Sequence, residues 1–233
     1  MKRILVAFGV LGLCIGWSQD KSRQERLVPK NTLTAEEQRQ GFELLFDGKS
    51  LDKFDVAPGQ EKIFLVAEGA IKTDSSGAGG TLLTKSDYAN FVLKAEFRAN
   101  PNVNSGIMLR NPRPRPPAAD AKSTKKGGGG GQGYELQIRD KDPGNYSGGS
   151  FLTGSIVNVG KAPADTKIKP GEWNTVECTM DKDHIVVIYN GQKVVDGHDL
   201  RLANGAIGLQ LAHPEDARGA DIEFRNLKVK RLP

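Results

Sequence analysis

The chain has 233 residues, of which 26% are charged, with a formal net charge of +5 and two cysteines. This length suits one sizeable β sandwich or barrel, and two cysteines exclude a disulfide-rich scaffold. The positive excess lies at Lys2 and Arg3 and in residues 111–133, where five basic side chains accompany one acidic side chain. Because the rest is close to neutral, the sequence gives no support to a nucleic-acid-binding face.

The first segment has the order of a secretory signal peptide. Lys2 and Arg3 precede an apolar run from Ile4 to Trp17, and a polar sequence begins at Ser18. With 14 residues, the run is shorter than the roughly 20 that a membrane-spanning helix needs, and no comparable run follows it. We therefore expect a signal peptide over residues 1–18, export to the periplasm or the extracellular space, and no transmembrane segment.

A lipoprotein anchor at Cys14 is the alternative to cleavage after Ser18. Gly16 and Ser18 provide the small residues that cleavage after Ser18 requires. Leu13, in contrast, fills the position before Cys14 where a lipoprotein signal needs a small residue. We therefore favour ordinary cleavage, which leaves Cys178 as the remaining cysteine and allows no intramolecular disulfide.

Residues 19–40 are predicted to contain a flexible leader and then one short helix. The leader is polar and aperiodic, and Thr34-Ala35-Glu36-Glu37 fits a capping box, in which Thr34 and Glu37 satisfy backbone donors at a helix start. From Phe42 onward, short runs rich in β-branched and aromatic residues are punctuated by Gly, Asn, Asp and Pro. Residues 41–233 are therefore predicted to form one all-β domain.

Several runs alternate between apolar and polar residues, as strands with one buried side do. Residues 91–98 and 173–180 are the clearest, and the second places Cys178 on its apolar face as a small core residue. Asn190-Gly191 between two further runs, 185–189 and 192–195, predicts a hairpin with a type I′ turn. Other strands are predicted at 63–66, 81–84, 105–110, 134–139, 155–159, 206–211 and 222–230, with a bulge near Asn226 in the last.

This series of short strands with almost no helix indicates two stacked antiparallel sheets. Between two of the strands lies Asn111-Pro112-Arg113-Pro114-Arg115-Pro116-Pro117, followed by a basic patch and five consecutive glycines. Proline removes backbone donors and a glycine run is hard to order, so residues 111–133 are predicted to be an exposed, solvated loop insertion. A lid over a site and a docking segment for an acidic polymer are the alternatives for this loop.

Several common catalytic motifs are missing from the sequence. It has no Gly-x-Ser-x-Gly elbow, no Walker loop, no His-Glu-x-x-His and no paired-cysteine metal site, and its three histidines are scattered. The remaining candidate is a pair of strands that each carry polar residues on one face.

In the first of these strands, Asn104, Met108 and Arg110 share one face, and Gly106 allows close approach. In the second, one face carries Glu135, Gln137 and Arg139, and Asp140 follows at the strand end. A surface of amide, carboxylate and guanidinium groups suits sugar hydroxyls, and an ordinary solvated sheet face is the alternative interpretation.

Seven motifs follow one another along the chain: Phe42-Glu43-Leu44-Leu45-Phe46-Asp47-Gly48-Lys49-Ser50-Leu51, Asn104-Ser105-Gly106-Ile107 with Arg110, Tyr134-Glu135-Leu136-Gln137, Gly171-Glu172-Trp173-Asn174, Asn190-Gly191, Ile207-Gly208-Leu209-Gln210 and Phe224-Arg225-Asn226-Leu227. In these motifs the chain resembles the 3-keto-disaccharide hydrolase domain family, from about Gly41 to Leu232. The resemblance implies a concanavalin A-like jelly roll that cleaves glycosides whose C3 hydroxyl has been oxidised to a ketone.

The resemblance also implies roles for single residues. A base would remove the acidified C2 proton, so that the C1 leaving group departs by elimination and water adds afterwards. On this basis Glu135 is the hypothesised base and Arg110 the partner of the enolate or ketone oxygen. The hypothesised substrate binders are Asn104, Gln137, Asp140 and Gln210.

A divalent metal ion is the cofactor that some relatives of this family imply, and Glu135 with His213 would be its ligands here. His213 follows Gln210 by three residues, whereas the family pattern has a histidine two residues after this glutamine. Two other functions stay open at this point. One is a non-catalytic carbohydrate-binding module, and the other is an envelope interaction protein whose basic loop binds acidic polysaccharide.

Overall fold

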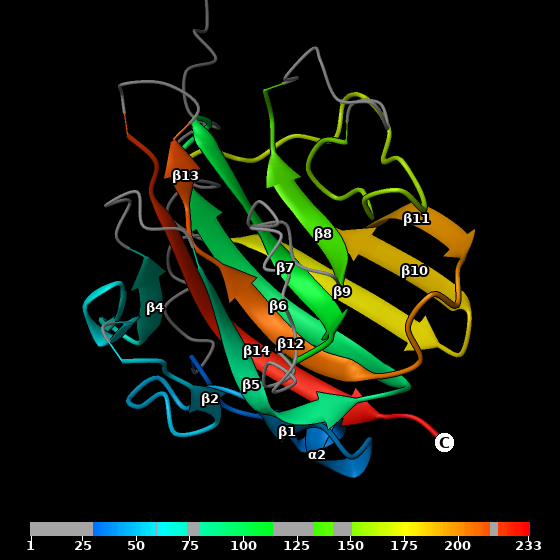
Figure 1. Cartoon of the computed structure of the whole chain (residues 1–233), viewed down its shortest axis with the longest axis horizontal. Coiled ribbons are helices and arrows are strands. Elements are labelled where there is room, and N and C mark those ends of the chain that lie inside the picture. Colours follow the sequence, from blue (N-terminus) through cyan, green and yellow to red (C-terminus); the bar gives the residue numbers. More distant parts are fainter. Residues whose placement is uncertain (1–29, 59, 74–79, 114–132, 142–150, 215–218) are drawn as a thin grey trace, which may run out of the picture. The chain divides into compact units, whose positions relative to one another are not determined.

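The computed structural model describes residues 30–58, 60–73, 80–113, 133–141, 151–214 and 219–233, and Figure 1 shows the two β-sheets that they form. The predicted signal peptide, most of the leader and residues 114–132 of the predicted loop lie outside these ranges. Within the ranges, no helix is long and apolar enough to span a membrane.

The short helix α2 (Ala35–Arg39) begins at the predicted capping box. The Thr34 hydroxyl accepts a hydrogen bond from the Glu37 N–H at 3.1 Å, and the Glu37 carboxylate accepts one from the Thr34 N–H at 2.9 Å. Lys228 of strand β14 (Ile222–Arg231) donates to the same carboxylate at 2.7 Å. The capping residue therefore also attaches the helix to a sheet.

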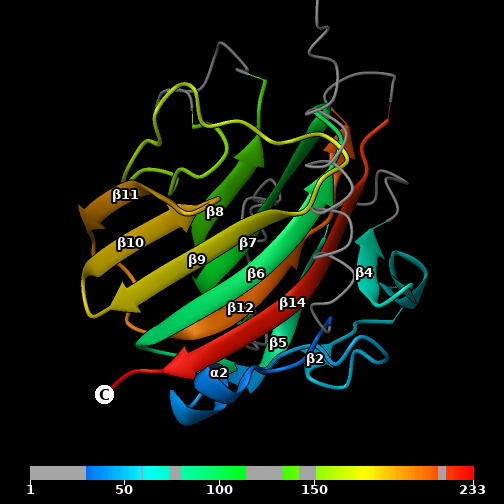
Figure 2. The ribbon, with the colours of Figure 1, turned by 180° about the vertical axis from the view of Figure 1, so that it is seen from behind.

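The first sheet, which we name sheet A, has eight strands among the described residues, and all its pairings are antiparallel. Their spatial order is β11-β10-β9-β6-β14-β4-β3, with β1 beside β14. Figure 2 shows this sheet from its outer side. Its strands are β1 (Glu43–Leu44), β3 (Phe64–Ala67), β4 (Ala70–Thr73), β6 (Phe91–Ala99), β9 (Asn174–Asp181), β10 (His184–Tyr189), β11 (Gln192–His198) and β14.

The second sheet, sheet B, is also antiparallel and has six strands in the described ranges. They are β2 (Phe54–Asp55), β5 (Thr81–Tyr88), β7 (Val103–Asn111), β8 (Tyr134–Arg139), β12 (Gly205–Gln210) and β13 (His213–Pro214), and the 3-10 turn η1 (Gln60–Lys62) lies between β2 and β3. Strand β8 pairs with one edge of β7, and β12 and β13 pair one after the other with its opposite edge.

The core lies between the two sheets and is built by the predicted alternation. Phe91, Leu93, Ala95 and Phe97 of β6 are all at most 3% exposed, and Ile107 and Leu109 of β7 belong to the same cluster from the other sheet. Each large apolar side chain buried in this way contributes about 1.5–3 kcal/mol to folding. Cys178 is fully buried in the core, and this burial raises the pKa of its thiol to about 12. The predicted two-sheet, all-β architecture is confirmed.

Local turn chemistry explains both a correct and a wrong strand prediction. Asn190 and Gly191 adopt φ angles of 48° and 82°, which a type I′ turn requires, and the predicted hairpin forms there. The strand predicted at 155–159 is wrong. Ile156 makes only isolated bridges, because the chain turns at Gly154 and Asn158, where φ is 85° and 63°.

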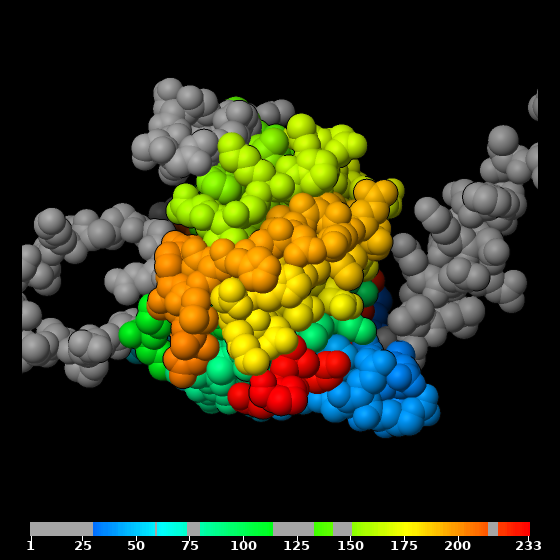
Figure 3. Space-filling model, turned by 90° about the vertical axis from the view of Figure 1, so that its right-hand side faces the viewer, coloured from blue at the N-terminus to red at the C-terminus, as the bar shows by residue number. Residues whose placement is uncertain are grey.

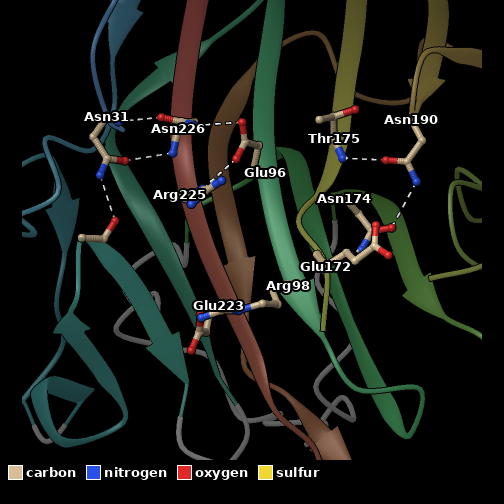
Figure 4. A network of polar contacts seen from close by, with 11 residues as sticks. Asn31, Glu96, Arg98, Glu172, Asn174, Thr175, Asn190, Glu223, Arg225 and Asn226 are labelled. Atoms are coloured by element: carbon tan, nitrogen blue, oxygen red, sulfur yellow. Dashed lines mark hydrogen bonds and ion pairs between the residues drawn. The ribbon is translucent and has the colours of Figure 1, made fainter. Parts of the chain in front are cut away.

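The predicted bulge at Asn226 is confirmed, since the register of β14 against β6 shifts between Arg225 and Lys228. Figure 4 shows that Asn31 and Asn226 bond reciprocally, each side-chain oxygen accepting the other's backbone N–H, at 2.5 and 2.9 Å. The Asn226 amide also donates to Glu96 at 2.8 Å. The bulge thus holds Asn31 against strand β14 of sheet A.

Charged groups on this outer face mostly pair with one another. Arg225 donates to Glu96 at 2.7 Å, and Arg98 donates to Glu223 at 2.5 and 3.0 Å. The Trp173 ring lies against both guanidinium groups, 3.8 Å from that of Arg225 and 4.8 Å from that of Arg98. These contacts make the outer face of sheet A a structural surface.

Candidate functional site

The face of sheet B that is turned away from the core gathers the predicted polar residues. Ile107 and Leu109 of β7 point into the core cluster, whereas the intervening Met108 does not belong to it. Met108 pairs with Glu135 of β8 on one side and with Gly208 of β12 on the other. We name this side the polar face of sheet B, defined by Asn104, Gly106, Met108, Glu135, Gln137, Arg139, Gly208 and Gln210.

Glu135 lies at the centre of the polar face. Its carboxylate crosses β7 over Gly106, where a Cβ atom would stand only 3.0 Å from the Glu135 Oε1 and 3.1 Å from its Cγ. Burial raises the pKa of this carboxyl above its usual range, although the positive charge of Arg139 and a hydrogen bond with Gln210 both lower it. A carboxylate with a raised pKa is a stronger proton acceptor, as a general base requires.

Gln210 reaches the same carboxylate from the opposite edge of β7. The side chain is 8% exposed, and its amide is close enough to Glu135 for hydrogen bonding to lower the pKa of that carboxyl. The Gln210 Oε1 atom is buried and accepts no hydrogen bond from the described part of the chain. Since Glu135 can only accept when ionised, the amide nitrogen must be the end of Gln210 that faces it, and Oε1 points elsewhere.

Arg110 does not join the polar face, contrary to the position predicted for it. Between Met108 and Asn111 the strand carries one residue more than its partner β12, and Arg110 has a φ of 48°. This bulge turns the Arg110 side chain away from the alternation of its neighbours. The fully buried guanidinium instead donates to the backbone carbonyls of Ala89, Lys182 and Leu202, at 2.7, 2.7 and 3.0 Å. It therefore joins three turns of the chain.

Asp140, predicted to bind substrate, also lies apart from the polar face. Its carboxylate accepts hydrogen bonds from the Thr153 hydroxyl at 2.8 Å and from the Ile168 N–H at 3.0 Å. Both partners belong to the segment 151–170, which Figure 3 shows in yellow-green beside the strands coloured yellow and orange. Asp140 thus holds this segment next to sheet B.

The remaining predicted binders lie on or beside the polar face. Asn104 is half-buried and pairs with Arg139 on one side and with His213 of β13 on the other. Gln137 is buried beside Gly106, and its side-chain oxygen accepts the N–H of Ile138 at 3.2 Å. Together with Gln210, these amides can offer both donors and acceptors to sugar hydroxyls.

Two of the predicted residues, Glu135 and His213, were expected to share a metal ion. Glu135 pairs with Met108 and His213 with Asn104, on opposite edges of β7, so four residues or about 13 Å of strand separate the two levels. The Glu135 side chain shortens this separation, because it reaches over Gly106, but two side chains are fewer than the three protein ligands that even a catalytic zinc site uses. Within the described ranges, no group of three His, Cys, Asp or Glu side chains is placed to hold a metal. We therefore derive no step through a metal.

Arg139 is the positive group that the structure brings near Glu135, in the place expected for Arg110. The positive charge of Arg139 lowers the pKa of Glu135, and the two side chains stand four residues apart on the same face of β8, with Gln137 between them. The sequence already indicated that Arg139 shares a face with Glu135, since strand alternation groups Glu135, Gln137 and Arg139. The predicted role of Gly106 in allowing close approach is confirmed by its contact with Glu135.

Comparison with known proteins gives one family and a group of similar folds. A family model described as the 3-keto-alpha-glucoside-1,2-lyase-like domain matches residues 41–230. No curated protein matches the chain significantly.

Among solved structures, a candidate glycosyl hydrolase from Parabacteroides distasonis ATCC 8503 has a TM-score of 0.68 and 22% identity, covering 88% of this chain and 100% of that chain. A second from the same organism has a TM-score of 0.56 and 24% identity, covering 82% and 99%. The exoplasmic/lumenal domain of VIP36, solved in a Ca2+/Man3GlcNAc-bound form, has a TM-score of 0.53 and 12% identity, covering 84% and 90%. At these identities the likeness shows the shared fold alone.

Proposed function

Because the chain belongs to the 3-keto-alpha-glucoside-1,2-lyase-like family, we propose that it cleaves glycosides whose C3 hydroxyl has been oxidised to a ketone. The observation that carries the proposal is the Glu135 carboxyl, whose pKa is raised by burial and which lies among amide groups on the polar face of sheet B. A carbohydrate is the substrate class that such a face suits, since sugar hydroxyls both donate and accept hydrogen bonds.

Glu135 acts as the base in this proposal. The C3 ketone acidifies the C2 proton, and Glu135 takes it, leaving an enolate whose negative charge lies on the C3 oxygen. As the enolate collapses, the C1–O bond breaks, a C1–C2 double bond forms, and the departing alkoxide takes a proton from water. The hydroxide left behind takes the proton from Glu135, which regenerates the base. A second water then adds to C1 and a proton returns to C2. The net reaction consumes one water and yields the 3-keto sugar and the free alcohol.

Arg139 is the group that we assign to the enolate oxygen. It stands four residues, about 13 Å, along β8 from Glu135, and the Glu135 carboxylate reaches along the face toward it, over Gly106. A fixed positive group near the developing charge stabilises the transition state more than the ground state. Arg110 has no part in this step, because its guanidinium is buried against backbone carbonyls.

Two disaccharides test the proposal directly. The protein is incubated with a 3-keto disaccharide and with the unoxidised parent, each with and without a chelator, and products are separated by chromatography. We expect 3-keto-glucose from the oxidised substrate, no product from the parent, and no effect of the chelator. Absence of product from the oxidised disaccharide would contradict the proposal.

A non-catalytic carbohydrate-binding module is the second candidate function. It is favoured by the three amide side chains on or beside the polar face, Asn104, Gln137 and Gln210, which would bind a sugar without any chemistry. The same incubation separates the two candidates, because a binding module would retain the sugar in a saturable manner and release no product.

A further inference from the structure

The position of the Glu135 carboxylate depends on two residues from neighbouring strands. The carboxylate starts on β8, crosses β7 at Gly106 and meets Gln210 of β12. Glycine is needed at position 106 for space and not for backbone freedom, since its φ is not among the positive values of the chain. Any Cβ there would press on both the Glu135 Oε1 and the Leu136 carbonyl, each at 3.0 Å.

Gln210 has two functional ends, and only one of them is used within the described chain. Its amide nitrogen faces Glu135, which leaves the buried Oε1 as an acceptor without a hydrogen bond. Buried acceptors are rarely left in this state, because burial removes the water that would otherwise satisfy them. An unpaired acceptor beside the base therefore points to a donor that arrives with the substrate.

We propose that Gln210 and Gly106 position the Glu135 carboxylate, and that the Gln210 Oε1 accepts a hydrogen bond from the C2 hydroxyl of the substrate. This inference rests on the proposed function. The two ends of one amide group are close together, and so are the C2 proton and the C2 hydroxyl, which share one carbon atom. A single glutamine can thus orient the base and also position C2, the carbon from which the base takes its proton. The site would select 3-keto glycosides that carry a free C2 hydroxyl.

The test compares two substrates on two forms of the protein. The substrates are an aryl 3-keto-glucoside and its 2-deoxy analogue, and the protein is the full chain, wild type or Gln210→Met. We expect wild type to lose about 100-fold in kcat/KM when the C2 hydroxyl is removed, because a site built for a hydroxyl rejects its absence strongly. Gln210→Met should lose a similar factor on the parent substrate and distinguish the two substrates by at most about 3-fold. The ratio of kcat/KM between the two substrates is taken for each protein form. Dividing the wild-type ratio by the Gln210→Met ratio cancels the difference in intrinsic reactivity between the substrates.

A pH profile provides the readout that a merely structural role of Gln210 would not move. The hydrogen bond with Gln210 lowers the pKa of Glu135, so its loss in Gln210→Met raises that pKa. Because the base must be deprotonated, the acid limb of kcat/KM should move to higher pH. Gly106→Ala, which displaces the carboxylate, should lower kcat and retain the discrimination between the two substrates.

The matched control is Gln192→Met, an exposed glutamine on β11, which should behave as wild type in every measurement. If Gln210→Met discriminates against the 2-deoxy substrate as strongly as wild type does, the inference is wrong while the proposed function stands. If wild type cleaves neither 3-keto substrate, the proposed function and the inference fall together.

Discussion

Replacing Glu135 with Gln should lower kcat/KM for a 3-keto-glucoside by about 10³-fold or more. The amide is close in size to the carboxyl, so it keeps the contact over Gly106 but can no longer accept a proton. Proton transfer by a positioned base contributes about 10²–10⁴-fold to a rate. Release of 3-keto-glucose in steady-state assays measures the loss, and thermal unfolding checks that the fold is intact.

The pH dependence of the wild-type protein's proposed activity belongs to the same prediction. Burial raises the pKa of Glu135, and a base works only when deprotonated, so activity should increase as the pH rises through this raised value. The matched control is Glu172→Gln, an exposed glutamate outside sheet B, which should keep the wild-type rate. Full activity of Glu135→Gln would remove Glu135 from the mechanism.

Replacing Arg110 with Met should lower the free energy of unfolding by about 3 kcal/mol. The guanidinium is fully buried and satisfies the carbonyls of Ala89, Lys182 and Leu202. Methionine would leave these acceptors unpaired, and each buried unpaired acceptor costs about 1–3 kcal/mol. Part of this cost is offset, because a buried charge no longer has to be desolvated. Denaturant unfolding followed by circular dichroism measures the change.

A surface arginine provides the comparison for Arg110. Arg39 of α2 is exposed and pairs with Glu36 within the helix, so Arg39→Met should change the unfolding free energy by less than about 0.5 kcal/mol. If Arg110→Met kept wild-type stability but lost turnover, the structural role would be contradicted. Arg110 would then contact the substrate, as the resemblance of its sequence motif implies.

Where local chemistry decides the structure, the sequence was sufficient. The capping box at Thr34, the Asn190-Gly191 turn and the bulge at Asn226 all formed as predicted. Each depends on residues that are neighbours in the chain, such as those that tolerate positive φ. Strand alternation also placed Glu135 and Gln137 on one face, because a regular strand keeps a period of two.

Where the outcome depends on pairing between distant strands, the same reasoning failed. Strand alternation placed Arg110 on the face of Asn104. The bulge that turns it away arises only from the register of β7 against β12, so the local sequence carried no sign of it. Asp140 was expected to bind substrate, but its partners Thr153 and Ile168 lie in a segment whose path could not be predicted. The contact between Glu135 and Gln210, from strands far apart in sequence, had no local signal either.

The central claim is that the polar face of sheet B breaks the glycosidic bond by removing the C2 proton. Cleavage of a 3-keto-glucoside in D2O tests this most directly, because the proton returned to C2 then comes from the solvent. We predict one deuterium at C2 of the released 3-keto-glucose, measured by mass spectrometry at short times and corrected for exchange of the product alone. Released sugar that retains the original hydrogen at C2 and carries no deuterium would indicate direct displacement at C1 and contradict the elimination.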